Sequence, residues 1–124
     1  MNTSFAQDHD GGTHTPNYCS EDKSCAHLMF PTYPTTKEES HFIVHVLPKS
    51  PTAVIENLQV KLWMDMGNGH GHGSAPVKIE VGEEAFHYEV SSAWFVMPGN
   101  WQIIVSFKED GMARQFNIPF QIKE

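Results

Sequence analysis

The sequence predicts an all-β fold, an antiparallel two-sheet sandwich of about seven strands that follows an extended N-terminal arm. Short runs of alternating apolar and polar residues recur from residue 41 onward, and turn-forming residues separate them. No segment carries a sustained helical period with capping residues. Two packed sheets of immunoglobulin type bury one face of every such strand. We therefore expect residues 1–38 to form an extended, partly disordered arm and residues 39–124 to form the sandwich.

Each predicted strand has apolar side chains at every second position. The clearest run extends from Leu58 to Asp65, where Leu58, Val60, Leu62 and Met64 share one face. The other predicted strands cover residues 42–46, 77–81, 86–90, 93–97, 101–108 and 116–122. Residues 109–111, Glu-Asp-Gly, predict the hairpin turn into the last strand. Pro119 has no N–H to donate to a ladder, so that last strand is expected at a sheet edge or a bulge.

Size and charge limit the classes of function. A chain of 124 residues fits a single domain. Its 15 Asp and Glu residues against 8 Lys and Arg give a formal charge of −7, which disfavours binding to nucleic acid or to an anionic membrane surface. No apolar run approaches the roughly 18 residues that a membrane-spanning helix needs, so we expect no membrane insertion.

The N-terminus gives an indication of export. Ser4-Phe5-Ala6 has the small-x-small form found at secretory cleavage sites, although an ordinary mobile N-terminus accounts for these residues equally well. We expect a secreted protein, periplasmic or otherwise extracytoplasmic. Cleavage after Ala6 would leave Gln7-Asp8-His9 at the start, and a third-position imidazole there forms a square-planar Cu(II) or Ni(II) site.

The two cysteines favour a disulfide. Cys19 and Cys25 are an even pair at short spacing, which in an exported protein predicts a bridge that closes a small loop. In a reducing compartment the same pair would indicate a redox or metal site. The segment Cys25-Ala26-His27-Leu28-Met29 also holds three soft or borderline ligands, an alternative that ranks behind the disulfide.

The strongest chemical signal is a segment rich in methionine, histidine and glycine that follows the clearest strand. Met64, Met66, His70 and His72 lie within nine positions; three glycines separate them in a predicted loop, and a fourth, Gly73, follows His72. Thioether sulfur suits Cu(I), and imidazole serves Cu(I), Cu(II), Zn and Ni, so this mixture points first to copper. The alternative for the methionines is structural, because they share the parity of the apolar face and would end a core strand.

The same region resembles a known family. Met64-x-Met66, Gly and His in a loop, then Pro and Val, and finally Met97-Pro98-Gly99-Asn100-Trp101 resemble the YtkA-like and FixH-like extracytoplasmic domains, over about residues 57–105. The resemblance implies an immunoglobulin-like sandwich linked to copper transport or oxidase assembly. It covers Met64, Met66, one of the two histidines and Met97, which adds a further candidate sulfur. The doubled Gly-His departs from the family's single His-Gly.

The sequence thus predicts a copper-binding or copper-handling protein, acting as a chaperone, buffer or accessory domain. The expected metal ligands are His70, His72, Met66, Met64 and Met97, and the expected cofactor is Cu(I) or Cu(II). An envelope metal transporter or an oxidase-assembly protein is the expected partner. The alternative is a non-metal protein-interaction module of the bacterial envelope.

Enzymatic activity is not expected. No Ser, His and Asp residues stand in a recognisable triad or nucleophile elbow, and the glycine loop leads into a strand rather than a helix. A copper redox enzyme is a second alternative that the ligand mixture allows. His41 and His45 lie on one face of a predicted strand but roughly 13 Å apart, too far for one ion, so we interpret them as surface histidines.

Overall fold

The structure is a computed structural model that describes residues 12–67 and 70–123. Ser4–Ala6 and Gln7–His9, which carry the export and N-terminal copper predictions, lie outside the described residues. The described residues form ten strands and no helix long and apolar enough to cross a membrane. The strands are β2 Thr13–His14, β3 Tyr18–Cys19, β4 Cys25–Phe30, β5 Ser40–Leu47, β6 Ile55–Gly67, β7 His70–Gly73, β8 Lys78–Val81, β9 His87–Ala93, β10 Gly99–Glu109 and β11 Met112–Ile122.

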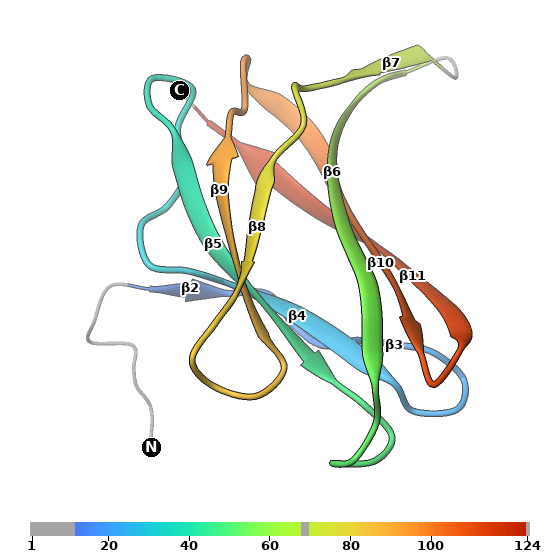
Figure 1. Cartoon of the computed structure of the whole chain (residues 1–124). Coiled ribbons are helices and arrows are strands. Elements are labelled where there is room, and N and C mark those ends of the chain that lie inside the picture. Colours follow the sequence, from blue (N-terminus) through green and yellow to red (C-terminus); the bar gives the residue numbers. More distant parts are fainter. Residues whose placement is uncertain (1–11, 68–69, 124) are drawn as a thin grey trace.

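The strands form two sheets in which every pair is antiparallel. The first sheet has the order β11-β10-β6-β7, and the second has the order β2-β4-β5-β9-β8 with β3 also paired to β4. Figure 1 shows β6, β10 and β11 in one layer and β4, β5, β8 and β9 in the other. The prediction of an all-β protein with two antiparallel sheets is confirmed.

The core fills the space between the inner faces of the two sheets. Alternate residues of β4, β5, β6, β10 and β11 point inward, as period-2 patterning requires. The largest side chains that are almost fully buried are Trp101, Phe30, Phe42, Phe95, Leu28, Leu62, Ile103, Ile118 and Ile122. Each such side chain contributes about 1.5–3 kcal/mol by leaving water.

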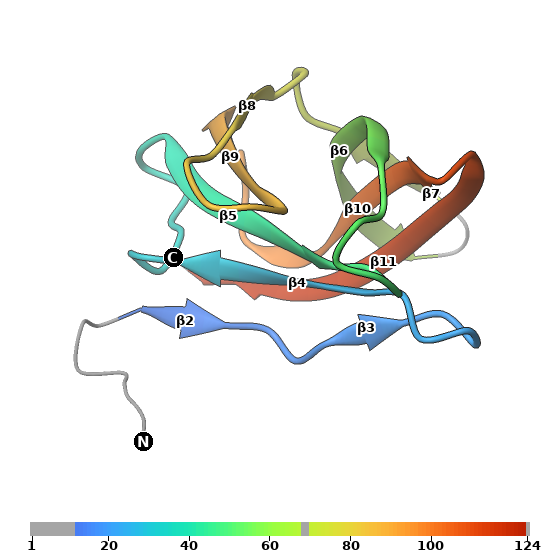
Figure 2. The same cartoon turned by 60° about the horizontal axis from the view of Figure 1, so that its bottom comes forward.

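The N-terminal segment differs from the prediction. Residues 13–30 do not form an arm beside the domain but supply β2, β3 and β4, and β4 lies inside the second sheet, between β2 and β5. Ala26, Leu28 and Phe30 are buried from β4 into the common core. Figure 2 shows β2 and β3 following one another along β4. The polar residues on either side of this strand concealed it, and so did His27 and Met29, which look like metal ligands and take its outward positions.

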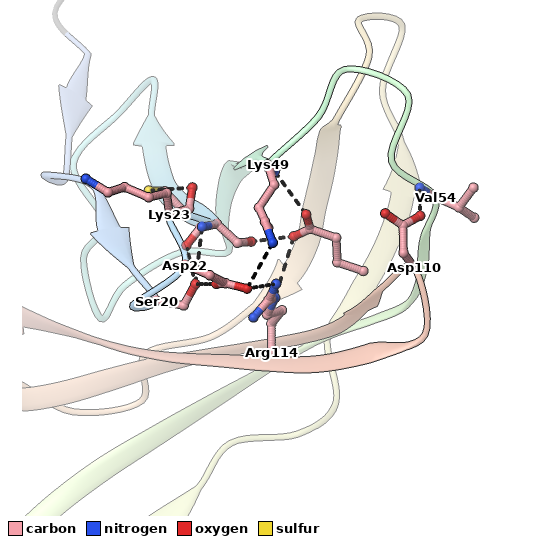
Figure 3. A network of polar contacts seen from close by, with 10 residues as sticks. Ser20, Asp22, Lys23, Lys49, Val54, Asp110 and Arg114 are labelled. Atoms are coloured by element: carbon pink, nitrogen blue, oxygen red, sulfur yellow. Dashed lines mark hydrogen bonds and ion pairs between the residues drawn. The ribbon is translucent and has the colours of Figure 1, made fainter.

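A disulfide and a polar network hold this segment in place. Cys19 and Cys25 are bonded and are also direct partners in the β3–β4 ladder, as the sequence favoured. In the loop between them, Asp22 accepts a hydrogen bond of 2.7 Å from the Arg114 guanidinium of β11 and lies 3.5 Å from the Lys49 ammonium (Figure 3). Ser24 donates to the buried carboxylate of Glu109 at the end of β10. The loop therefore contacts both sheets.

Two boundaries in the second half of the chain also differ from prediction. No separate strand forms at residues 93–97, because β9 ends at Ala93 and residues 94–97 lie between β9 and β10. The glycine and histidine segment predicted as a loop forms β7, which pairs back onto β6 as a hairpin. The predicted turn at residues 109–111 does join β10 to β11, and Pro119 does lie in an edge strand.

Candidate functional site

The predicted copper ligands gather at the β6–β7 end of the first sheet. Met64 is buried and belongs to the core, in agreement with the structural alternative for this residue, whereas Met66 is 53% exposed. The ladder pairs Met64 with His72 and Gly67 with His70, and Met66 falls at the register shift between Asp65 and Gly67. His70 and His72 are placed through their backbone, and their side chains lie outside the described part of the structure.

Met97 lies at this same end of the fold, although it comes from a different part of the chain. Trp101 is the ladder partner of Met64 and donates its indole N–H to the Met97 carbonyl oxygen at 2.9 Å. Gly99, with φ of +141°, approaches Met64 so closely that an added Cβ would lie 2.7 Å from the Met64 Cε. The turn before β10 and the β6–β7 hairpin both lie at the top of Figure 1. We call these five candidate ligands the hairpin cluster.

The glycines of the hairpin have a packing role. A Cβ added at Gly71 would lie 2.5 Å from the Trp63 Nε1 and 2.6 Å from the Met64 carbonyl oxygen. Gly73 is less crowded, because a Cβ added there would lie 3.4 Å from the Leu62 carbonyl oxygen and 3.7 Å from the Trp63 ring. Glycine at position 71 therefore lets the hairpin close against the Trp63 indole. The prediction of a loop for these glycines missed this contact.

A second group of potential ligands, which sequence reasoning missed, crosses the outer face of the second sheet. His27 of β4, His45 of β5 and His87 of β9 are direct ladder partners, and His14 of β2 lies diagonally beside His27. We call these four residues the histidine row. Its ring centroids are 6.1 Å apart for His14 and His27, 4.9 Å for His27 and His45, and 4.1 Å for His45 and His87.

The environment of the row favours the neutral form of its two central rings. Burial, followed by the neighbouring His45, His14 and His87, lowers the pKa of His27 from 6.5 to about 4. Burial and then His87 lower the pKa of His45, while Glu84 acts in the opposite direction. Both effects disfavour the charged imidazolium. Neutral imidazole is the form that binds a metal ion.

The row was hidden because its members come from four strands. Sequence spacing groups His45 with His41 as surface histidines, and the structure separates them: His41 is exposed beside Glu39 at 3.6 Å, whereas His45 is half-buried in the row. The available signal was His27, which stands between Cys25 and Met29, but its partners depend on ladder register. Among the described residues, no group of three or more His, Cys, Asp or Glu side chains is arranged to hold one ion as it stands.

Comparisons with known proteins add no identification. A scan against protein-family models and searches of curated proteins and of solved structures find no significant match. The resemblance to YtkA-like and FixH-like domains therefore stays a prediction, which depends on the motifs around Met64 and Met97.

Proposed function

We propose that this protein binds copper outside the cytoplasm and acts as a copper chaperone, buffer or accessory protein. The observation that supports the proposal most directly is the hairpin cluster. Met64 and Met66 lie on β6, His70 and His72 lie on its ladder partner β7, and Met97 is joined to this end of the fold by the Trp101 indole, whose residue pairs with Met64. A mixture of thioether and imidazole donors at one place favours copper over harder ions.

The members of the hairpin cluster have different expected roles. Met66 and Met97 are exposed, so each presents a thioether without a change in the core. Met64 is packed against Gly99 and forms the buried wall beneath them. His70 and His72 supply the imidazoles in the proposal. Binding of a metal ion changes no covalent bond of a substrate, so the proposal includes no catalytic step.

The extracytoplasmic setting is part of the same proposal. The Cys19–Cys25 disulfide accords with an oxidising compartment, where such bridges persist. The resemblance to YtkA-like and FixH-like domains implies an envelope metal transporter or an oxidase-assembly protein as the partner that delivers or receives the ion.

The test is a titration of the metal-free protein with Cu(I) and with Cu(II) in the presence of competing chelators. We expect tight Cu(I) binding that falls at least about 10-fold in the His70→Ala/His72→Ala variant, since even residues that only support metal ligands cost 10–100-fold in affinity. A Met112→Leu variant is the control, because Met112 is an exposed methionine at the start of β11. Equal Cu(I) affinity in all three proteins would overturn the proposal for this cluster.

A second candidate function is binding of an envelope protein without metal. Trp94, Val96 and Met97 are exposed in the segment that leads to β10, and Met66 is exposed on the neighbouring hairpin. Exposed apolar residues gathered in this way are typical of interaction surfaces. Under this alternative, Trp94→Ser and Val96→Ser would weaken pull-down of an envelope partner, and His70→Ala/His72→Ala would leave that interaction unchanged.

A further inference from the structure

The histidine row differs from an ordinary set of surface histidines in its alignment. Three of its members are direct partners across three adjacent strands, so their Cα positions are fixed by the ladders rather than by loop conformation. Neighbouring rings are 4.1–4.9 Å apart along these three residues. A ligand site on paired strands is better ordered before binding than one on a loop.

His87 already has the hydrogen bond of a metal-binding histidine. Its Nδ1 lies 2.9 Å from the Ala85 carbonyl oxygen. A carbonyl oxygen only accepts, so Nδ1 carries the proton of this hydrogen bond and Nε2 is the ring nitrogen available to a metal ion. Histidines that bind metal commonly donate their other ring N–H to a backbone carbonyl, which fixes the ring orientation. Nε2 lies 3.7 Å from the Glu84 carboxylate, which favours a cation at this position.

His27 has a polar atom that the described protein leaves without a partner. Its Nδ1 is buried and makes no hydrogen bond to any described residue. An unsatisfied buried nitrogen costs about 1–3 kcal/mol. Coordination to a metal ion would satisfy this nitrogen.

The spacing of neighbouring rings in the row is compatible with a shared ion. Two imidazoles on one tetrahedral ion, with metal–nitrogen distances of about 2.0–2.1 Å, have ring centroids roughly 5 Å apart. His27 and His45 meet this value at 4.9 Å with an edge-to-face angle of 71°. His45 and His87 are stacked at 4.1 Å and must open by about 1 Å. His27 and His87 lie on the strands either side of β5, so both rings must also turn toward His45 before all three can reach one ion.

We propose that His27, His45 and His87 form a second metal site, which takes a borderline divalent cation, Cu(II) first. An all-imidazole set suits Cu(II), Zn and Ni, and Cu(II) has the highest affinity among these ions. The half-buried Met29 lies on the same face, opposite His14 and two residues from His27, and provides a neighbouring thioether. This site lies on the other sheet from the hairpin cluster and does not depend on it.

The test uses Cu(II) alone, titrated into the full metal-free chain with glycine as the competing chelator. Bound copper is counted, and electron paramagnetic resonance reports the number of nitrogen ligands. We expect His45→Ala and His87→Ala each to weaken Cu(II) binding at least about 10-fold and to reduce the nitrogen count by one. His41→Ala is the matched control, because it removes an exposed histidine from the same strand. His87→Ala, on a different strand, covers the case in which His45→Ala does not fold.

The same titration on His70→Ala/His72→Ala separates this site from the hairpin cluster. The row proposal is supported if the row variants lose Cu(II) binding and the hairpin variant retains it, whatever the outcome for Cu(I). The row proposal would be overturned if His87→Ala and His45→Ala left both the Cu(II) affinity and the nitrogen count unchanged. The hairpin proposal would still stand in that case, provided that the hairpin variant loses Cu(I). An equal loss in His41→Ala would also overturn it, because binding would then be adventitious.

Discussion

The hairpin cluster and the histidine row are two proposed metal sites whose residues are brought together in opposite ways. The hairpin cluster takes four of its five candidates from nine consecutive positions, residues 64–72, and the fold adds only Met97. The row takes one histidine from each of four strands that span residues 13–93, and no two of its members are close in sequence. A motif search detects the first kind of site. Only strand register discloses the second.

The two regions also differ in how they are fixed. The hairpin is held by the pairing of β7 with β6 and by the contact between Trp63 and Gly71. His27, His45 and His87 lie on interior strands of a sheet, and the first of these strands, β4, follows a loop held by a disulfide and by the network of Figure 3. Substitutions that damage one anchor should therefore leave the other region intact.

The largest expected effect tests the hairpin anchor. Gly71→Val places side-chain atoms where the Met64 carbonyl oxygen and the Trp63 indole already lie, so β7 must move away from β6. Overpacking of this kind costs about 1–3 kcal/mol, and backbone contact places Gly71→Val near the upper value. Chemical denaturation measures the loss, and Gly73→Ala, at a less crowded glycine, is the control. A variant with unchanged stability, or one that loses Cu(II) binding at the row, would contradict the separation of the two regions.

A somewhat smaller effect is expected from removal of the bridge that precedes the row. Replacing both Cys19 and Cys25 by Ala opens a loop with a sequence separation of 6. Loop entropy gives a loss of about 2 kcal/mol in the free energy of unfolding. The Cu(II) affinity of the row should fall with it, because His27 follows Cys25 by two residues in β4, while the Cu(I) affinity of the hairpin cluster stays the same. Thermal melts and the two titrations check this, and a change confined to Cu(I) would contradict it.

The smallest effect is a pH dependence of the network. Hydrogen bonds from Ser20 and Arg114 lower the pKa of Asp22 well below its usual range. A carboxyl group whose pKa is lower in the folded state stabilises the fold above its unfolded pKa of about 3.9, and this stabilisation is lost as the pH falls below that value. Asp22→Asn should therefore be less stable than the original protein at pH 7, and the two should converge as the pH approaches 2. Denaturation curves at several pH values measure the difference, and parallel curves would exclude this role.

The sequence predicted the two-sheet fold because alternation is a local pattern. Residues 58–65, 101–108 and 116–122 show it directly, and the structure has strands at all three places. The hidden strand β4 shows where this method fails. His27 and Met29 at its outward positions made the segment look like a ligand motif within an arm, and only the burial of Leu28 and Phe30 reveals a core strand.

The candidate sites also divide into residues that local sequence identifies and residues that only strand pairing brings together. Met64, Met66, His70 and His72 could be named from adjacency, and the placement of Met97 beside them could only be guessed. The row could not be predicted, because the pairing of His45 with both His27 and His87 depends on two ladder registers at once. A shift of one residue in either register would send one ring to the opposite face of the sheet.

The contact between Trp63 and Gly71 has a practical consequence. The indole of Trp63 is half-buried against the hairpin backbone, with the Lys61 ammonium 5.1 Å from its ring, whereas Trp101 is buried in the core. The hairpin therefore carries its own fluorophore, the core carries an internal reference, and the third tryptophan, Trp94, is exposed. Opening of the hairpin would move the emission of Trp63 toward that of an indole in water, so a Trp94→Phe variant reports the state of this region without any attached label.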